Sequence, residues 1–356
     1  MFYEIFLSSV FLSSFIISLF IGILIIFKKN FFLNKNFENQ YQPQKIHFDL
    51  TPRIGGACIF FGLTLQIIFQ YDSNFQSIIF CILIGGPAFF VGLAEDWTRK
   101  ISPIYRLLAT LFSGILFVFF MDNRITSIDL YFVDELLVIS YISVIFTILA
   151  IAVLSQAANI IDGLNGLSLG ISLTIFTAYA FLANEYDDEL IKFSCVVFAG
   201  LISGLFILNF PFGKIFLGDG GSYFIGVVCA IISIMLSERN LNISPFCIVL
   251  LLIFPLYETF RSIFRRIIFK TGGLFQPDSL HFHSLIYKYI IKNKQPIWLH
   301  NSISSMFILF LNSLFAFWAV VFHSEKQILI IGILLFILTI ETIIFFLKRM
   351  TNNFNT

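Results

Sequence analysis

Long apolar runs are the feature that most limits what this chain can fold into. Eleven stretches approach or reach the length of about 20 apolar residues that a helix needs to cross a bilayer. Hydrophobic residues make up 58% of the 356 residues and charged residues 12%, whereas soluble domains have about 45–50% and 25%. We therefore predict an all-α integral membrane protein, a polytopic helical bundle of about 10–11 transmembrane helices. The expected spans are 5–27, 54–71, 76–94, 103–121, 136–157, 164–183, 190–208, 222–237, 243–262, 298–322 and 327–347.

The spans leave no room for a soluble domain between them, so we expect one polytopic domain over residues 1–356. The polar motifs fall in a core of residues 40–285, and 298–347 forms a C-terminal helix pair. The first apolar run ends at Lys28 and Lys29. A signal peptide carries its charge before a shorter apolar core, so this run is expected to be a retained first helix.

The charge balance and the cysteines exclude several classes of function. A net charge of +1 provides no basic field for nucleic acid, so we expect no nucleic-acid partner. All five cysteines lie inside apolar runs and none has the spacing of metal ligands. A disulfide framework or a zinc site is therefore not expected.

The basic residues predict how the bundle lies in the membrane, because Lys and Arg favour cytoplasmic loops. Of the 22 basic residues, only Arg124, Lys192, Arg239 and Lys326 fall on the side opposite to the 28–53 connection. We therefore expect a multi-pass membrane protein with its N-terminus outside and its C-terminus on the cytoplasmic side.

Two polar motifs belong to the first two connections on the cytoplasmic side. His47 precedes Thr51-Pro-Arg-Ile-Gly-Gly56, where the proline and the glycines deliver Arg53 to the mouth of the second span. Glu95 and Asp96 stand at the end of the third span, and Arg106 lies one turn into the fourth. The acidic pair suits a metal ion, a proton transfer or a cationic partner, but helical pairing with basic residues four positions later explains it equally well.

Two further motifs combine acidic residues with glycines. Asn159 and Asp162 share one helical face in Asn-Ile-Ile-Asp-Gly-Leu-Asn-Gly, which has no basic residue and therefore needs a cation or a donor. In Gly218-Asp-Gly-Gly-Ser222, a glycine turn leads into a helix expected to begin near Ser222. Free amides at a helix N-terminus bind anions, and Asp219 beside them can hold Mg²⁺.

The long basic loop, about 263–297, and the end of the span before it hold the fifth cluster: Glu258, Arg261, Arg265, Arg266, His281 and His283. Two histidines without a nearby cysteine are a poor zinc site, so contact with a phosphate or another polar ligand fits better. Membrane topology alone also explains the arginines. All five motifs fall on the side assigned to the cytoplasm, however, and carboxylates with Mg²⁺ and arginines are typical of phosphoryl transfer. The membrane setting suggests a lipid phosphate as one substrate.

The ordered motifs over residues 40–285 resemble those of the polyprenyl-phosphate N-acetylhexosamine-1-phosphate transferases, a superfamily that includes phospho-N-acetylmuramoyl-pentapeptide transferase. The resemblance implies transfer of a sugar-1-phosphate from a UDP-sugar to undecaprenyl phosphate at the cytoplasmic face, with release of UMP. It also implies dependence on Mg²⁺, with Mn²⁺ as the alternative, and a place at the first membrane step of a cell-surface glycan such as O-antigen.

The resemblance also assigns roles to residues. Asp219 and Asn159 are the expected metal ligands, and Asp96, Glu95 and Asp162 the expected catalytic acids and bases. The expected substrate-binding residues are His47, Arg53, Arg106, Asn165, Arg266, His281 and His283.

The sequence departs from the family at Glu95, Asn165, Glu258 and Ser284, where the family often has Asp, Asp, Asp and His. The chain also departs from the pentapeptide transferases, notably by lacking their three consecutive histidines, and this favours a simple UDP-N-acetylhexosamine as the donor. A secondary transporter and an inactive membrane partner of the same fold are the alternative functions. The amino sugar, the downstream polymer and a homodimer are left open by the sequence.

Overall fold

A computed structural model describes residues 8–28, 51–69, 75–269, 280–290 and 297–352. Every regular element in these ranges is a helix, which agrees with the predicted all-α class. The first seven long helices are α2 (Ser9–Phe27), α4 (Gly56–Phe69), α5 (Phe75–Thr98), α6 (Pro103–Met121), α8 (Ser140–Ile160), α9 (Leu167–Glu185) and α10 (Glu189–Asn209). They are followed by α11 (Gly218–Arg239), α12 (Pro245–Leu251), α13 (Ile253–Phe269), α14 (Phe282–Ile290), α15 (Ile297–Val321) and α16 (Lys326–Asn352).

Ten of the eleven expected spans each correspond to one helix of the structure, and the ninth corresponds to α12 and α13 together. Among the described residues, nine helices are long and apolar enough to cross a bilayer, and α12 with α13 forms a tenth, bent candidate. The apolar helix α4 is the remaining one and is shorter, at Gly56–Ile68. The chain is therefore a multi-pass helical membrane protein.

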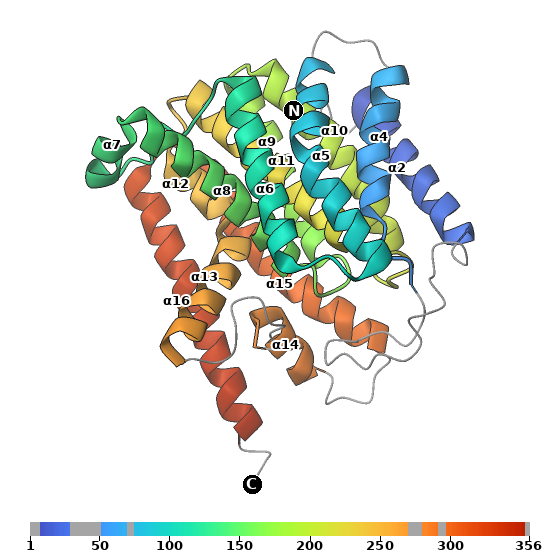
Figure 1. Cartoon of the computed structure of the whole chain (residues 1–356). Coiled ribbons are helices and arrows are strands. Elements are labelled where there is room, and N and C mark those ends of the chain that lie inside the picture. Colours follow the sequence, from blue (N-terminus) through green and yellow to red (C-terminus); the bar gives the residue numbers. More distant parts are fainter. Residues whose placement is uncertain (1–7, 29–50, 70–74, 270–279, 291–296, 353–356) are drawn as a thin grey trace.

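The ninth expected span, 243–262, is broken in the structure. Its two halves, α12 and α13, meet at an angle of 77°. Pro255 lies in the first turn of α13 and has no N–H to donate to the carbonyl of Leu251, the last residue of α12. The break sends α13 away from the direction of α12, below α8 and beside α16 in Figure 1.

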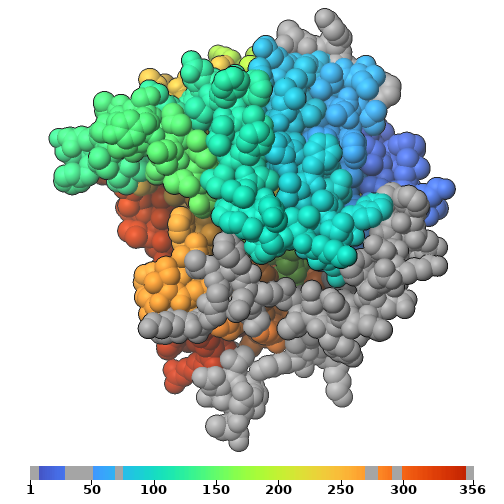
Figure 2. Space-filling model, in the orientation of Figure 1, coloured from blue at the N-terminus to red at the C-terminus, as the bar shows by residue number. Residues whose placement is uncertain are grey.

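A short helix, α7 (Tyr131–Leu137), was not expected from the sequence. It precedes α8, and both α7 and the start of α8 project sideways from the bundle in Figure 2. Tyr131, Phe132 and Val138 are exposed there. Lys326 at the start of α16 pairs with Asp129 at 2.9 Å and ties the preceding loop to the bundle.

The central helix of the bundle is α11, and 94% of the residues in its apolar 18-residue stretch are buried. It packs against α4, α5 and α8 (Figure 1). The contact with α4 is backbone against backbone, because a Cβ atom on Gly56 would overlap the Cα atom of Gly221. Small residues allow membrane helices to approach this closely. The close approach matters for function because it brings the starts of α4 and α11 together.

Replacing Gly56 tests this packing. We expect Gly56→Ala to lower the Tm of the detergent-solubilised protein, because overpacking of a tight contact costs about 1–3 kcal/mol. Gly86→Ala in α5 is the matched control, since its Cβ atom would lie 4.0 Å from its nearest neighbour, Phe90. Alanine is also the better helix former at this position. Equal thermal stability of the two variants would show that the α4–α11 contact is looser than described.

Candidate active site

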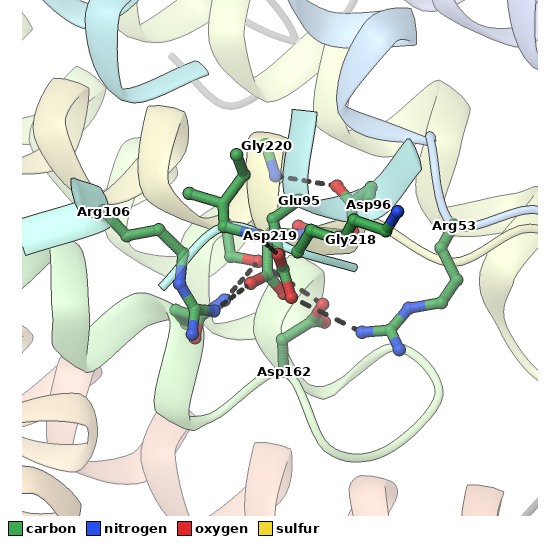
Figure 3. Close-up of polar contacts among 12 residues, drawn as sticks. Arg53, Glu95, Asp96, Arg106, Asp162, Gly218, Asp219 and Gly220 are labelled. Carbon is green, nitrogen blue, oxygen red and sulfur yellow. Dashed lines mark hydrogen bonds and ion pairs between the residues drawn. The ribbon is translucent and has the colours of Figure 1, made fainter. Parts of the chain in front are cut away.

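Asp219 in the first turn of α11 lies between two arginines from other segments (Figure 3). Arg106 of α6 donates from Nη1 to Asp219 Oδ2 at 2.6 Å. Arg53, just before α4, places Nη2 3.8 Å from Asp219 Oδ1. The Asp219 side chain is 14% exposed, so these charges interact in a partly desolvated setting where attraction is stronger than at a free surface. The structure thus brings these three predicted site residues together.

Asp96 at the end of α5 binds the start of α11. Its Oδ1 accepts the backbone N–H of Asp219 and its Oδ2 that of Gly220, both at 2.9 Å. These are orphan donors of a first helical turn, and a carboxylate there also matches the positive end of the helix dipole. Asp96 therefore makes a contact between helices and is not limited to pairing along α5.

This capping corrects one expectation from the sequence. The helix begins at Gly218 and not near Ser222, and two amides of its first turn are bound by Asp96. The anion site predicted from free amides at this helix N-terminus is thus taken by a carboxylate of the chain itself.

The Thr-Pro-Arg-x-Gly-Gly motif and the Gly-Asp motif form one backbone-paired unit. The amides of Gly55 and Gly56 donate to the carbonyls of Phe216 and Leu217 at 2.8 Å, and the amide of Phe216 donates to Pro52. Gly218 has φ +79°, and a Cβ atom there would overlap the carbonyl oxygen of Arg53. Only glycine suits this turn, which explains why the two motifs occur together.

Glu95, the other member of the acidic pair, holds the turn after α5. Its Oε2 accepts the backbone N–H of Ile101 at 2.7 Å. Arg99 in this turn has φ +53°. Burial and the Arg53 charge lower the pKa of Arg99, while the charges of the nearby acidic residues oppose the shift. The sequence suggested only that Arg99 pairs with Glu95 along the helix, whereas in the structure it also feels the charges of Arg53 and Asp219.

The Asn159 and Asp162 motif reaches the same place through Ser222. Asn159 Nδ2 and Asp162 Oδ2 each lie 3.5 Å from the Ser222 hydroxyl oxygen. Burial raises the pKa of Asp162 to about 7; the Arg53 charge opposes this shift and the Asp219 charge adds to it. Asp162 therefore belongs to the electrostatic cluster formed by Asp219 and Arg53.

The two predicted histidines stack on each other and on the Asp162 loop. The rings of His281 and His283 are 5.4 Å apart and nearly parallel, at 5°. A Cβ atom on Gly163 would lie 2.5 Å from His283 Nε2, so glycine is needed at this contact. Burial lowers the pKa of His283 to about 4, which keeps its ring neutral at pH 7. The histidine motif and the Asn159 motif thus lie side by side at the contact of His283 with Gly163.

Asn165, Arg266 and His47 are the remaining predicted substrate-binding residues. Asn165 is 2% exposed, its N–H donates to Asn301 Oδ1 at 2.6 Å, and its Nδ2 donates to the carbonyl of Pro211 at 3.0 Å. These contacts give Asn165 a role in holding the loop, and its contact with substrate stays a prediction. Arg266 lies half-buried on α13. His47 lies outside the described residues.

The donor set of the cluster suits a hard cation. Asp219, Asp162 and Asn159 offer carboxylate and amide oxygens, which Mg²⁺ prefers. The raised pKa of Asp162 also reflects negative charge from Asp219 that a cation would compensate. No group of three His, Cys, Asp or Glu side chains is already arranged around a metal position in the part of the chain described. Such a partial set fits Mg²⁺, which commonly takes one or two carboxylates and completes its shell with substrate phosphates and water.

The elevated pKa of Asp162 predicts a dependence of stability on pH. The folded chain holds this proton up to about pH 7, whereas an ordinary Asp loses it near 3.8. This contribution to stability is therefore present below about pH 4 and is lost as the pH rises toward 7. Asp162→Asn lacks the titration, so its Tm advantage over the wild type should widen from pH 5 to pH 8 in buffer with EDTA.

Glu189→Gln is the control for this experiment, because it removes an exposed carboxylate at the opposite end of the bundle. A difference between Asp162→Asn and the wild type that is the same at both pH values would contradict the described burial of Asp162.

The chain has relatives that share this part of its sequence. Residues 77–237 match the family model Glycosyl transferase family 4. A probable undecaprenyl-phosphate N-acetylglucosaminyl 1-phosphate transferase of Bacillus subtilis is 27% identical over 73% of this chain and 72% of that protein. A phospho-N-acetylmuramoyl-pentapeptide-transferase of Staphylococcus aureus is 28% identical over 53% of this chain and 63% of its own length. The enzyme of the same description from Staphylococcus carnosus is 26% identical over 65% and 76%. Residues 77–237 thus match glycosyl transferase family 4, and the names of these relatives support a place in the superfamily of polyprenyl-phosphate hexosamine-1-phosphate transferases.

Proposed function

We propose that this protein transfers N-acetylhexosamine-1-phosphate from a UDP-sugar to undecaprenyl phosphate and releases UMP. The observation that carries the proposal is the cluster at one end of the bundle, in which Asp219 lies between Arg53 and Arg106 and beside Asp162 (Figure 3). Four segments far apart in the sequence contribute to it. The names of the relatives from Bacillus and Staphylococcus support the same class of reaction.

The two arginines are the proposed binding groups for the phosphates. Guanidinium groups match phosphate oxygens with paired donors. Arg53 is the more accessible of the two, with its side chain 46% exposed, against 19% for Arg106. Arg53 is thus placed to meet a ligand first, while Arg106 holds Asp219.

The proposed metal ligands are Asp219 and Asn159, with Asp162 close by. A bound Mg²⁺, or Mn²⁺ in its place, would supply neutralisation of the pyrophosphate charge of the donor. Asp162 is the residue whose protonation would respond to that charge, because burial and Asp219 raise its pKa.

The proposed chemical step is a direct displacement. An oxygen of undecaprenyl phosphate attacks the β-phosphorus of the UDP-sugar, a new P–O bond forms, and the bond from that phosphorus to the bridging oxygen breaks, so that UMP leaves. A phosphate monoester is largely ionised near neutral pH, since its second pKa is about 6. The acceptor therefore needs no proton removed by the protein, which fits the use of both Asp96 oxygens in capping α11.

The proposed setting is the bacterial cytoplasmic membrane, with the cluster facing the cytoplasm and the N-terminus outside. The excess of basic residues on the side that carries the motifs supports this orientation. The acceptor is soluble only in the bilayer and the donor only in water, so a cluster at the end of the bundle is where both can meet. The transfer would begin the assembly of a cell-surface glycan.

Purified protein in detergent tests the proposed reaction. We expect formation of a lipid-linked sugar and release of UMP with undecaprenyl phosphate, Mg²⁺ and at least one member of a panel of radiolabelled UDP-sugars. Asp219→Ala should lower turnover by a factor of 100 or more, because it removes about 3 kcal/mol or more of charge stabilisation.

Glu189→Ala is the matched control, since it deletes an exposed carboxylate at the other end of the bundle and should keep wild-type turnover. Absence of a lipid-linked product with every donor would contradict the proposed transfer. Uptake of a solute into proteoliposomes without release of UMP would instead favour a transporter.

A further inference from the structure

Glu258 on α13 is a buried carboxylate whose two oxygens both bind the segment that carries the histidines. The residue is 1% exposed. Its Oε2 lies 2.8 Å from His281 Nδ1, and its Oε1 accepts the backbone N–H of Phe282 at 2.7 Å. Burying a carboxylate is costly unless it is hydrogen-bonded, and both oxygens are satisfied here by adjacent residues.

The same face of α13 holds this segment at a second point. Arg261 and Arg265 donate from Nη1 to the carbonyl of Leu280 at 3.2 and 3.3 Å. Glu258, Arg261 and Arg265 are spaced by three and four residues, which places them on one helical face. These two arginines therefore do more than satisfy membrane topology, since they anchor the residue before His281.

The C-terminal helix α16 holds α13 in place through a further side chain. Glu341 of α16 accepts from Arg261 Nε at 3.0 Å and from the Tyr257 hydroxyl at 2.5 Å. This contact links α13 to α16, which lies beyond the region matched by the family model. The orientation of α13, and with it the place of Glu258, is thus held by a helix that carries none of the sequence motifs.

The hydrogen bond to Glu258 determines which nitrogen of His281 remains for a ligand. A carboxylate accepts hydrogen bonds, so the proton of a neutral His281 ring lies on Nδ1 and the lone pair on Nε2. The ring cannot rotate freely, because it also stacks on His283. His283 in turn touches Gly163, next to Asp162. His281 is therefore fixed in direction and in its position relative to the Asp162 loop.

We propose that Glu258 is a positioning residue that holds His281 as its Nδ1–H tautomer and presents Nε2 as a hydrogen-bond acceptor to the donor sugar. This inference rests on the proposed transfer from a UDP-sugar. A neutral Nε2 accepts from an O–H or an amide N–H group, both of which an N-acetylhexosamine offers, and it cannot donate to a phosphate oxygen. Glu258 acts only through His281 and touches no substrate.

A double-mutant cycle measures this coupling. Glu258→Gln keeps the size of the side chain but provides one acceptor oxygen for two donors. We expect Glu258→Gln and His281→Ala each to raise the KM for the UDP-sugar about tenfold, the effect of one net hydrogen bond. The KM for undecaprenyl phosphate should stay unchanged. The double variant should be no worse than His281→Ala, because the two residues act as one unit.

The matched control is Glu238→Gln at the opposite end of α11. Glu238 also binds a backbone N–H and a side-chain donor, both on Thr126, at 2.9 and 2.7 Å. Glu238→Gln should leave the KM for the UDP-sugar and the KM for undecaprenyl phosphate unchanged. The inference would be overturned if the KM increases of Glu258→Gln and His281→Ala for the UDP-sugar multiply in the double variant. It would also be overturned if the KM for undecaprenyl phosphate rises equally. Neither result would contradict the proposed transfer reaction.

Nitrogen-15 spectra of labelled histidines provide a readout that does not depend on turnover. The chain has five histidines, and the signal lost in His281→Ala identifies residue 281. We expect the Nδ1–H tautomer for His281 in the wild type and a shift toward the Nε2–H form in Glu258→Gln. An Nε2–H tautomer or a doubly protonated ring in the wild type would overturn the inference even if no UDP-sugar is turned over, and this measurement needs no Glu258 variant to fold.

Discussion

The cap that Asp96 places on the first turn of α11 is the interaction on which the site depends. The first amides of a helix have no partner within it, and at the end of an apolar bundle they need one. Asp96 supplies two acceptors from α5, and the backbone of Pro52–Gly56 pairs with Phe216 and Leu217 beside it. Together these contacts fix where Asp219 lies. The Asp219 carboxylate is thereby placed between Arg53 and Arg106.

The charge arrangement around this turn explains why a cationic and an anionic ligand both suit it. Asp219 and Asp162 bring negative charge close together, and burial raises the pKa of Asp162 further. Arg53 and Arg106 compensate part of this charge, and Arg99 lies in the same field. A divalent cation would stabilise both ionised carboxylates and leave the arginines for the phosphates of the two proposed substrates.

Hydropathy was sufficient to predict most of the helices, whereas the candidate site residues were predicted from ordered motifs and their resemblance to a family. Each expected span has its helix, because about 20 apolar residues have few other ways to be buried. The break at Pro255 was missed, since the apolar pattern continues through it. The start of α11 at Gly218 was missed for a related reason: its first turn is stabilised by Asp96, 123 residues away, and no local signal reveals such a partner.

The roles inside the site were harder to predict than its members. Glu258 was placed in the fifth cluster and noted as a family departure, but it was given no role of its own. Its bond to His281 arises because α13 turns at the break and is held by α16. Asn165 was expected to bind substrate, yet its contacts with Asn301 and Pro211 make it part of the loop. Side chains of the same chemistry serve the fold or a ligand depending on contacts that the sequence does not encode locally.

The most direct test of the account is the pH dependence of kcat/KM for the wild type and for Asp96→Asn. If Asp96 holds α11 and removes no proton, the variant should lose activity by a similar factor at every pH, because its amide provides one acceptor oxygen in place of two. The shape of the profile should then be unchanged. Loss or displacement of the acidic limb in Asp96→Asn, with a Tm equal to that of the wild type, would contradict the account, because Asp96 would then titrate in the reaction without holding α11.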